Sequence, residues 1–159
     1  SCLFTFRDEF PSLLPGETTT RLADQAQMFE QFLLGDGYEG FSQLEWAPAP
    51  GQKVFVHGHC HQKAFNAHGA VSQLMAEAPG LMVEAIPSGC CGMAGACGYQ
   101  RETQEVSFKM AELDLAPAVR NTDPADWLVA DGFSCRHQIK DLAQRDARHA
   151  AQVLAGMLA

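Results

Sequence analysis

Residues 81–92 of this chain read LMVEAIPSGCCG: a short apolar run, then a turn, then two adjacent cysteines, Cys90 and Cys91, between Gly89 and Gly92. The apolar run predicts a β-strand. Adjacent cysteines cannot bridge each other without a strained ring, but both thiolates can reach one multinuclear metal site. Glycines let the backbone approach a bulky cofactor, so we expect all four residues to bind one. The alternative is a pair of buried structural cysteines, because free cysteine is among the most buried residue types.

The chain beyond residue 50 alternates between strand and helix patterns. Apolar runs predict further strands at residues 53–57 and 127–130, and helical spacing predicts helices at 64–78, 102–115, 135–144 and 147–158. This alternation is typical of βαβ units, so the sequence predicts an α/β fold with a small, mostly parallel sheet flanked by helices, of Rossmann-like type. One predicted helix carries a stripe of large apolar residues that we expect to face the core: Val106, Met110 and Leu113.

The first part of the chain has a different pattern. Residues 1–46 are predicted to form a helical segment, and the proline-rich run APAPG at 47–51 is typical of a linker. We therefore expect residues 47–159 to form a separate cysteine-rich α/β domain.

A cysteine follows each predicted strand within five residues: Cys60 after the first, Cys90 and Cys91 after the second, and Cys135 after the third. Right-handed crossovers place the carboxyl ends of parallel strands at one edge of the sheet, where the ligand crevices of open α/β sheets lie. Cysteines scattered through a core would have no reason to favour the same kind of loop three times. We therefore predict that these four cysteines converge on one site.

Two further cysteines need a separate account. Ser1-Cys2-Leu3 and Ser134-Cys135-Arg136 each open a helix-like run, and a helix dipole favours a thiolate in the first turn. The echo predicts that Cys2 is the last cysteine of a preceding repeat. Cys97 stands outside these motifs and is either a spare ligand or a small buried residue.

Histidines flank Cys60, the first of the four cysteines that we predict to converge. His59 and His61 stand on either side of Cys60, and imidazole is both a metal ligand and a proton carrier near redox centres. The alternative is that both are loop histidines bonded to the backbone. No GxGxxG or P-loop motif follows a strand, so we expect no flavin site in these residues.

Composition excludes several classes of function. The 159 residues carry a formal net charge of −8, which argues against nucleic acid or anionic lipid as a partner. No apolar run approaches the roughly 20 residues of a membrane span, and no signal peptide is visible. Six cysteines in a chain that is 47% hydrophobic fit a reduced, cytoplasmic protein better than a secreted disulfide scaffold. The chain opens without Met, which suggests a fragment of a longer protein.

Several motifs together resemble the cysteine-rich, CCG-type domain of iron–sulfur oxidoreductases, as in heterodisulfide reductase and glycolate oxidase iron–sulfur subunits. They are Ser1-Cys2-Leu3, His59-Cys60-His61, Gly89-Cys90-Cys91-Gly92-Met93-Ala94-Gly95 and Ala130-Asp131-Gly132-Phe133-Ser134-Cys135-Arg136. The sequences of the last two motifs are most similar to the C-terminal part of FAD-linked, iron–sulfur D-lactate-type dehydrogenases.

This resemblance implies a metal site and a parent enzyme. The ligands it implies are Cys60, Cys90, Cys91 and Cys135, with Cys2 closing the preceding repeat. Gly132 stands where the family has the first cysteine of a closing CxxC, which leaves four thiolates, a number that suits a 4Fe–4S type cluster or adventitious zinc.

The function expected from the resemblance is electron transfer. The parent would oxidise a D-2-hydroxy acid such as D-lactate or glycolate, and its FAD-binding and ferredoxin-like parts would lie outside these residues and act as partners. The segment is not expected to be catalytic alone, and its location is expected to be cytoplasmic or peripheral to the inner membrane through the parent enzyme. Two alternatives remain: a metal-free thiol–disulfide site, and a structural zinc-binding or docking domain.

Overall fold

A computed structural model of the chain describes residues 2–35, 39–47 and 49–159. Contacts divide it into two compact units, Ser1–Gln43 and Leu44–Ala159. The first unit is helical, as the sequence predicts. Its elements are α1 (Cys2–Arg7), α2 (Glu9–Leu13), α3 (Glu17–Gln25), α4 (Phe29–Leu33) and a 3₁₀ turn, η1 (Gly40–Gln43).

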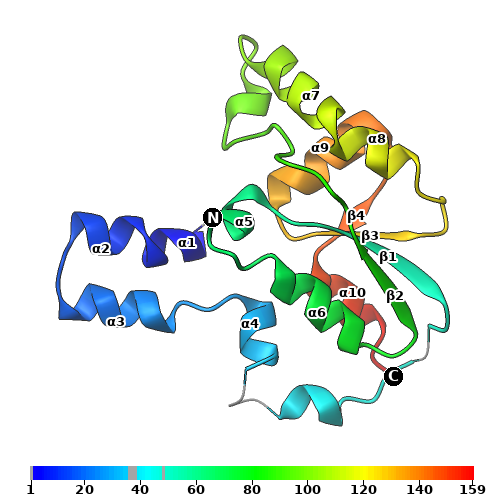
Figure 1. Cartoon of the computed structure of the whole chain (residues 1–159), viewed down its shortest axis with the longest axis horizontal. Coiled ribbons are helices and arrows are strands. Elements are labelled where there is room, and N and C mark those ends of the chain that lie inside the picture. Colours follow the sequence, from blue (N-terminus) through cyan, green and yellow to red (C-terminus); the bar gives the residue numbers. More distant parts are fainter. Residues whose placement is uncertain (1, 36–38, 48) are drawn as a thin grey trace. The chain divides into compact units, whose positions relative to one another are not determined.

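The second unit alternates strands and helices around one sheet (Figure 1). Its strands are β1 (Gln52–His57), β2 (Leu81–Ala85), β3 (Trp127–Ala130) and β4 (Ala147–Arg148). Its helices are α5 (Cys60–Ala64), α6 (Gly69–Glu77), η2 (Cys97–Tyr99), α7 (Gln104–Leu113), α8 (Leu115–Arg120), α9 (Phe133–Ala143) and α10 (Ala150–Gly156).

The sheet is parallel throughout, with the strand order β2-β1-β3-β4. Val56 of β1 pairs with Ala85 of β2, and His57 pairs with Ala130 of β3, so three strands end at one edge. Helices α6 and α10 contact each other, α8 packs on α9, and Figure 1 shows these two pairs on opposite sides of the sheet. The predicted α/β fold is confirmed.

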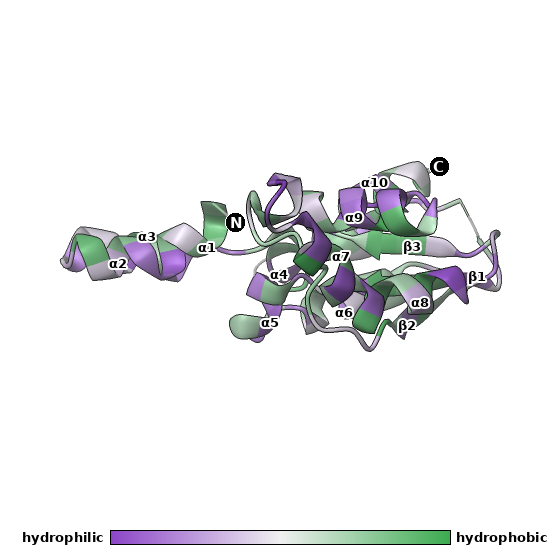
Figure 2. Ribbon diagram, turned by 90° about the horizontal axis from the view of Figure 1, so that it is seen from above, coloured by the Kyte–Doolittle hydropathy of each residue, from purple (hydrophilic) through white to green (hydrophobic). Residues whose placement is uncertain are grey.

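The core forms around the inner strands β1 and β3, which are largely buried, whereas the edge strand β2 is mostly exposed. Val54, Leu128 and Val129 are all buried, and β3 stands out as an apolar strand in Figure 2. Between the sheet and α8 and α9 lies one continuous cluster of buried residues: Ile86, Cys91, Met93, Leu115, Val119, Leu128, Ala130, Cys135 and Ile139. Two of the predicted site cysteines therefore belong to the core.

Several predicted boundaries are wrong. The helix expected at 64–78 begins only at Gly69, as α6, because a separate short helix, α5, ends at Ala64 and Asn66 between them has φ of 53°. The helix expected at 102–115 ends at Leu113, and α8 follows it, with Pro117 accommodated in the first turn, where no backbone N–H bond is lost. A short strand, β4, forms where the last helix was expected to begin, because Ala147 pairs with Leu128 of β3.

The apolar stripe of α7 does not face the core. Val106, Met110 and Leu113 are 54%, 39% and 76% exposed, whereas Ser107 and Ala111 on the other face are buried. The reason is close packing, because the loop that carries the cysteine pair runs directly against Ser107. Only small residues on α7 leave room for that approach.

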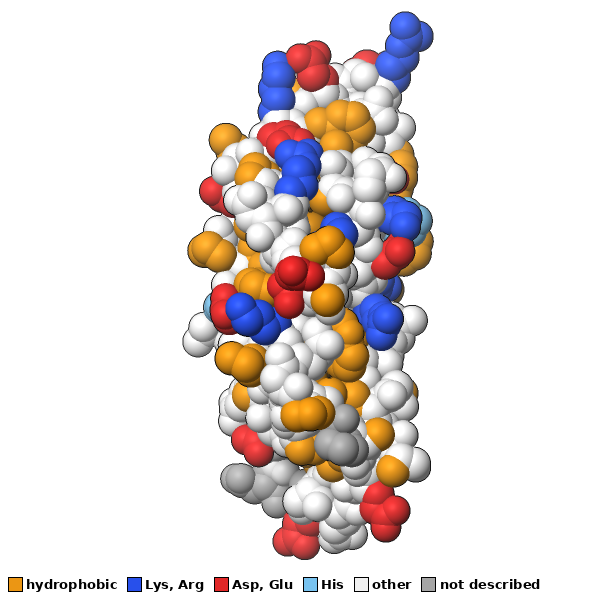
Figure 3. Space-filling view, turned by 90° about the vertical axis from the view of Figure 1, so that its right-hand side faces the viewer, with side chains coloured by type: hydrophobic (Ala, Val, Ile, Leu, Met, Phe, Trp, Pro, Cys, Tyr) orange, Lys and Arg blue, Asp and Glu red, His pale blue; other side chains and the backbone are white. Residues whose placement is uncertain are grey.

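Charges are mixed on the surface drawn in Figure 3, where Lys and Arg side chains are interspersed with Asp and Glu. Among the described residues, no helix combines the length and the apolar character that a membrane crossing requires.

Gly92 is required by both conformation and space. Its φ is +87°, and a Cβ there would overlap the carbonyl oxygen of Ser107. Gly95 also has positive φ, +67°, but nothing lies within 4 Å of its Cβ position. We predict that Gly95→Ala costs about 1 kcal/mol of backbone strain, and that Gly92→Ala costs at least ~3 kcal/mol because α7 must also shift. Urea unfolding of both variants measures this difference, and equal losses would show that the contact with Ser107 is not tight.

His57 makes the stability of the fold depend on pH. Its side chain is 2% exposed, Nδ1 lies 2.8 Å from Ser88 Oγ, and Nε2 has no hydrogen-bond partner among the described residues. Burial, and then the nearby Lys63 ammonium, lower the pKa of His57 from 6.5 to about 3. Between these two values the unfolded chain binds a proton that the folded chain does not.

The free energy of unfolding should therefore fall by about 1.4 kcal/mol per pH unit on account of His57 as the pH drops from 6 to 4. Asn at this position can keep a bond to Ser88 but cannot titrate. Comparing the pH dependence of urea unfolding for the wild type and His57→Asn isolates this contribution from that of the carboxylates. Parallel curves for the two proteins would contradict it.

Candidate metal centre

The four cysteines predicted to converge lie at the carboxyl edge of the sheet. Cys60 opens α5 just beyond β1, Cys90 and Cys91 lie in the loop beyond β2, and Cys135 lies in the first turn of α9 beyond β3. The Cys135 thiol donates a hydrogen bond to Cys91 Sγ at 3.3 Å. The Cys90 thiol interacts with both Cys60 and Cys91. The structure thus brings all four sulfurs together.

Burial divides the four thiols into two pairs. Cys91 and Cys135 are 3% and 1% exposed and belong to the apolar cluster, whereas Cys90 is half-buried and Cys60 is exposed. All four are free thiols in the described chain, as are Cys2 and Cys97. The group therefore has a buried inner side and an outer side that solvent can reach.

The hydrogen bond within the buried pair shifts the pKa values of the two thiols in opposite directions. The hydrogen bond from Cys135, together with one from the backbone N–H of Met93, lowers the pKa of Cys91 to about 6 even though burial opposes this. Donating that bond, and burial, raise the pKa of the Cys135 thiol. Burial also raises the pKa of Cys90, where the Gly92 N–H acts in the opposite direction. Cys91 is thus the sulfur most ready to act as a thiolate ligand.

Backbone and ammonium groups shape the loop that carries the cysteine pair. The Gly92 N–H donates to Cys90 Sγ at 3.3 Å. Lys63, on α5, donates to the carbonyl of Ser88 and, at 3.0 Å, to that of Gly89. This lysine therefore ties the helix of Cys60 to the loop of Cys90.

The two histidines beside Cys60 have different surroundings. His59 is the N-cap of α5, and its Nδ1 accepts the N–H of His61 at 3.2 Å, which leaves Nε2 as its remaining ligand atom. The His61 ring packs edge-on against Phe65, with centroids 6.0 Å apart. A Cβ at Gly132 would lie 2.6 Å from His59 Cδ2 and 2.8 Å from Cys135 Sγ. Neighbouring side chains therefore fill the space at position 132, where the family that the sequence resembles has a further cysteine.

Thiol donors suit either an iron–sulfur cluster or a single zinc ion, and the spacing of the sulfurs bears on the choice. Thiolates are the ligands of both, but four sulfurs around one zinc at about 2.3 Å lie about 3.8 Å from one another. Among the described residues, no three cysteine sulfurs all lie within 4.8 Å of one another. The four thiols are therefore not arranged as a zinc tetrahedron.

The other two cysteines lie elsewhere. Cys2 is exposed in the first unit, in α1. Cys97 is half-buried in η2, where its carbonyl accepts a hydrogen bond from Thr103.

Sequence reasoning missed the polar residues that hold the loops, above all Gln62 and Asp131. Gln62 is 4% exposed, and its Nε2 donates to Asp131 Oδ2 at 3.0 Å. A signal for Gln62 was present: the pattern His-x-x-Gln occurs at 59–62 and again at 149–152, and both copies form capping boxes at helix starts.

Comparison with known proteins identifies relatives among dehydrogenases. The chain is 30% identical over its whole length to the C subunit of the anaerobic glycerol-3-phosphate dehydrogenase of Escherichia coli K12, of which it spans 39%. It is 33% identical over 68% of its length to D-2-hydroxyglutarate dehydrogenase of Escherichia coli K12 and 32% identical over 69% to that of Pseudomonas putida, and it spans 11% of each.

No protein-family model matches the chain, and no solved structure matches it. The chain spans about two fifths of the glycerol-3-phosphate dehydrogenase relative and about a ninth of the D-2-hydroxyglutarate dehydrogenases. It is thus a homologue of parts of larger oxidoreductases.

Proposed function

We propose that the chain is an iron–sulfur electron-transfer module of an FAD-linked oxidoreductase that acts on D-2-hydroxy acids such as D-lactate or glycolate. The observation that carries the proposal is the meeting of four thiols from three βα loops at one edge of a parallel sheet. The relatives support it, since they are named as dehydrogenases and one kind is named for a D-2-hydroxy acid.

Cys60, Cys90, Cys91 and Cys135 would hold the cluster. When bound, it would supply one-electron transfer between an FAD elsewhere in the parent protein and an acceptor. The backbone N–H groups of Gly92 and Met93 stabilise negative charge on sulfur. The apolar cluster keeps water from Cys91 and Cys135, and both influences set the potential of a cluster.

The finer assignments belong to the same proposal. They are the CCG-type domain, the 4Fe–4S type of cluster, the role of Cys2 and the first unit in closing a preceding repeat, the flanking roles of Gly89 and Gly92, and additional ligation by His59 or His61. The partners would be FAD-binding and ferredoxin-like parts of the parent protein, in the cytoplasm or at the periphery of the inner membrane.

A second candidate is thiol–disulfide chemistry without metal. It is favoured by the 3.3 Å contact between Cys91 and Cys135, which two sulfurs could close into a disulfide. Both sulfurs are almost fully buried, however, and exchange with an external thiol requires access. The iron–sulfur proposal uses all four thiols, including the exposed Cys60.

Anaerobic reconstitution with iron and sulfide should give a brown protein that holds about four irons per chain. Single Ser substitutions at Cys60, Cys90, Cys91 or Cys135 should abolish or greatly weaken iron retention, because a four-ligand cluster that loses one thiolate exposes an oxidisable iron. Cys2→Ser and Cys97→Ser serve as matched controls and should keep the wild-type iron content. The measurement is iron per chain with a visible spectrum for all six variants.

Three results would count against the assignment. Full iron in Cys91→Ser with loss in Cys97→Ser would mean that the ligands are wrongly chosen. A colourless protein with one zinc per chain would favour a structural zinc site. A wild type that takes up neither metal, and whose Cys91–Cys135 pair oxidises reversibly, would favour the thiol–disulfide alternative.

A further inference from the structure

We infer that Asp131 is a positioning residue that holds Cys60 against the other three cysteines. The carboxylate follows β3 directly, and its side chain is 9% exposed. Oδ2 accepts the Gln62 Nε2–H at 3.0 Å, and Oδ1 accepts the Ala150 N–H at 3.1 Å. One carboxylate thus joins the start of α5 to the start of α10. The role of the four cysteines as cluster ligands rests on the proposed function, but the hydrogen bonds that Asp131 accepts do not.

Gln62 carries the link to Cys60. Its Oε1 accepts the backbone N–H of His59 at 2.9 Å, so its Nε2 must face the Asp131 carboxylate. His59 directly precedes Cys60, and the carboxylate is therefore two hydrogen bonds away from the backbone that carries this thiol.

Cys60 needs such a hydrogen-bonded link because the helix that carries it is too short to be stable alone. Helix α5 has only five residues, far fewer than a helix needs to be stable alone, and the Cys60 side chain is exposed. Cys91 and Cys135, by contrast, are fixed by the apolar core. Polar links from α5 to other elements must therefore set where Cys60 stands.

Asp131 is also held by the residue that follows Cys135. Arg136, the residue after Cys135, donates through Nη1 to the carbonyls of Ala130 at 2.8 Å and Asp131 at 2.7 Å. A continuous chain of contacts therefore runs from the residue beside Cys135, through Asp131 and Gln62, to the residue beside Cys60. It joins parts of the chain that are 69 residues apart.

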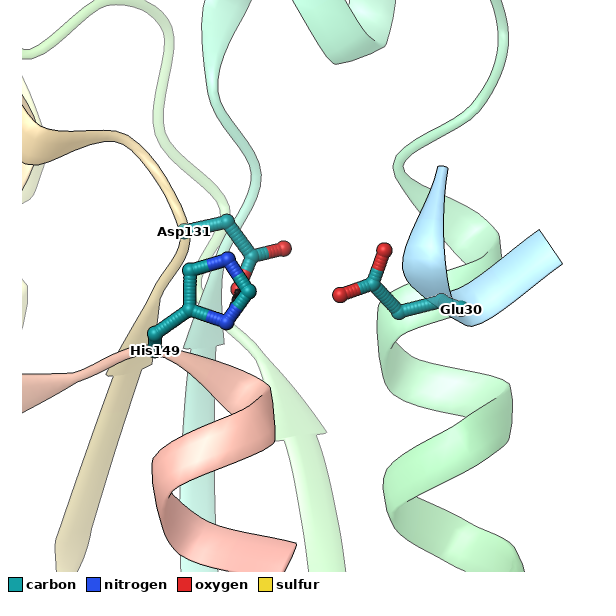
Figure 4. Close-up of side chains that lie close together, drawn as sticks. All are labelled: Glu30, Asp131 and His149. Carbon is teal, nitrogen blue, oxygen red and sulfur yellow. Dashed lines mark ion pairs between the residues drawn. The ribbon is translucent and has the colours of Figure 1, made fainter. Parts of the chain in front are cut away.

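His149 lies beside the same carboxylate but does not take the place of Gln62. Figure 4 shows its ring next to Asp131, with Nδ1 at 3.6 Å from Oδ1. That nitrogen accepts the Ala151 N–H at 3.1 Å as the cap of α10, so it has no proton to donate to Asp131. The two short bonds of the carboxylate are those to Gln62 and Ala150.

The test exchanges the two ends of the link. Asp131→Asn leaves one oxygen for the two N–H donors of Gln62 and Ala150, so one of the two bonds is lost. Gln62→Glu places a carboxylate opposite Asp131 and removes the bond between these two side chains. The double variant Asp131→Asn/Gln62→Glu restores it with donor and acceptor reversed, while the other oxygen of the new carboxylate at position 62 still accepts from His59. Gln152→Glu, at the equivalent place in the capping box of α10, is the matched control.

The first readout needs no metal. In a background with Ala at 91 and 135 and Ser at 2 and 97, diamide oxidation reports the rate at which Cys60 and Cys90 form a disulfide. A second background with Ser at 2, 60, 90 and 97 reports Cys91 with Cys135, which does not depend on α5. Each single change should slow the Cys60–Cys90 disulfide about fivefold, as expected for the loss of one hydrogen bond.

The double variant should recover most of the wild-type rate, while Gln152→Glu and the Cys91–Cys135 rate should stay unchanged. A general loss of stability would slow or speed both pairs and would not be rescued by the exchange. Unchanged Cys60–Cys90 rates in both single variants, or no rescue, would overturn the proposal.

The second readout is iron per chain after anaerobic reconstitution, in the full-cysteine chain. Loss in the single variants with recovery in the double variant supports the positioning role in the cluster site. If the wild type binds no iron but the disulfide rates follow the predicted pattern, the proposed function fails and the positioning role of Asp131 stands. If iron binds equally to all variants and the rates do not change, the positioning role fails and the proposed function stands.

Discussion

The parallel register of β1, β2 and β3 is the constraint on which this site depends. Because the three strands run in the same direction, the loops that follow them leave the sheet at one edge, with His57 paired to Ala130 and Val56 to Ala85. Each loop then needs only a few residues to bring a cysteine to the same place. An antiparallel neighbour would have sent its following loop to the opposite edge, about the length of a strand away.

Four sulfurs held together pose a charge problem that the protein solves only in part. Thiolates at this distance repel one another, and the apolar surroundings of Cys91 and Cys135 raise the cost of ionising both. Three contacts lower this cost: the Cys135 thiol donates a hydrogen bond to Cys91, the Gly92 N–H donates to Cys90, and Lys63 of α5 binds a carbonyl of the loop that carries Cys90. The positive core of an iron–sulfur cluster would offset part of this repulsion, so binding of metal and ordering of such loops would be coupled.

The inner and outer halves of the site are held by different forces. Cys91 and Cys135 are fixed by packing, since they belong to the same buried cluster as Leu128 and Ile139. Cys60 lies on a five-residue helix that little apolar surface supports, and hydrogen bonds from Gln62 and Lys63 position it instead. A site with one rigid, dry side and one polar, accessible side can admit a metal from solvent and still hold it firmly.

The strands and the loops that carry the cysteines could be predicted from the residues alone. Short, mostly apolar runs at 53–57, 81–86 and 127–130 mark the strands, and the short βα loops oblige the cysteines that follow to lie at one edge. From this, the α/β fold and the meeting of the four thiols could be predicted.

The buried face of α7 and the polar residues that hold the site depend on contacts between distant segments. The large apolar stripe of α7 faces outward because Ser107 must approach Gly92 closely, a steric demand that no local periodicity records. The pairing of Gln62 with Asp131 joins residues 69 positions apart, and neither side chain carries a local sign of its partner. A hydrophobic pattern lies within one segment and can be recognised from its sequence. Steric fit and buried hydrogen bonds form only between segments that have already come together.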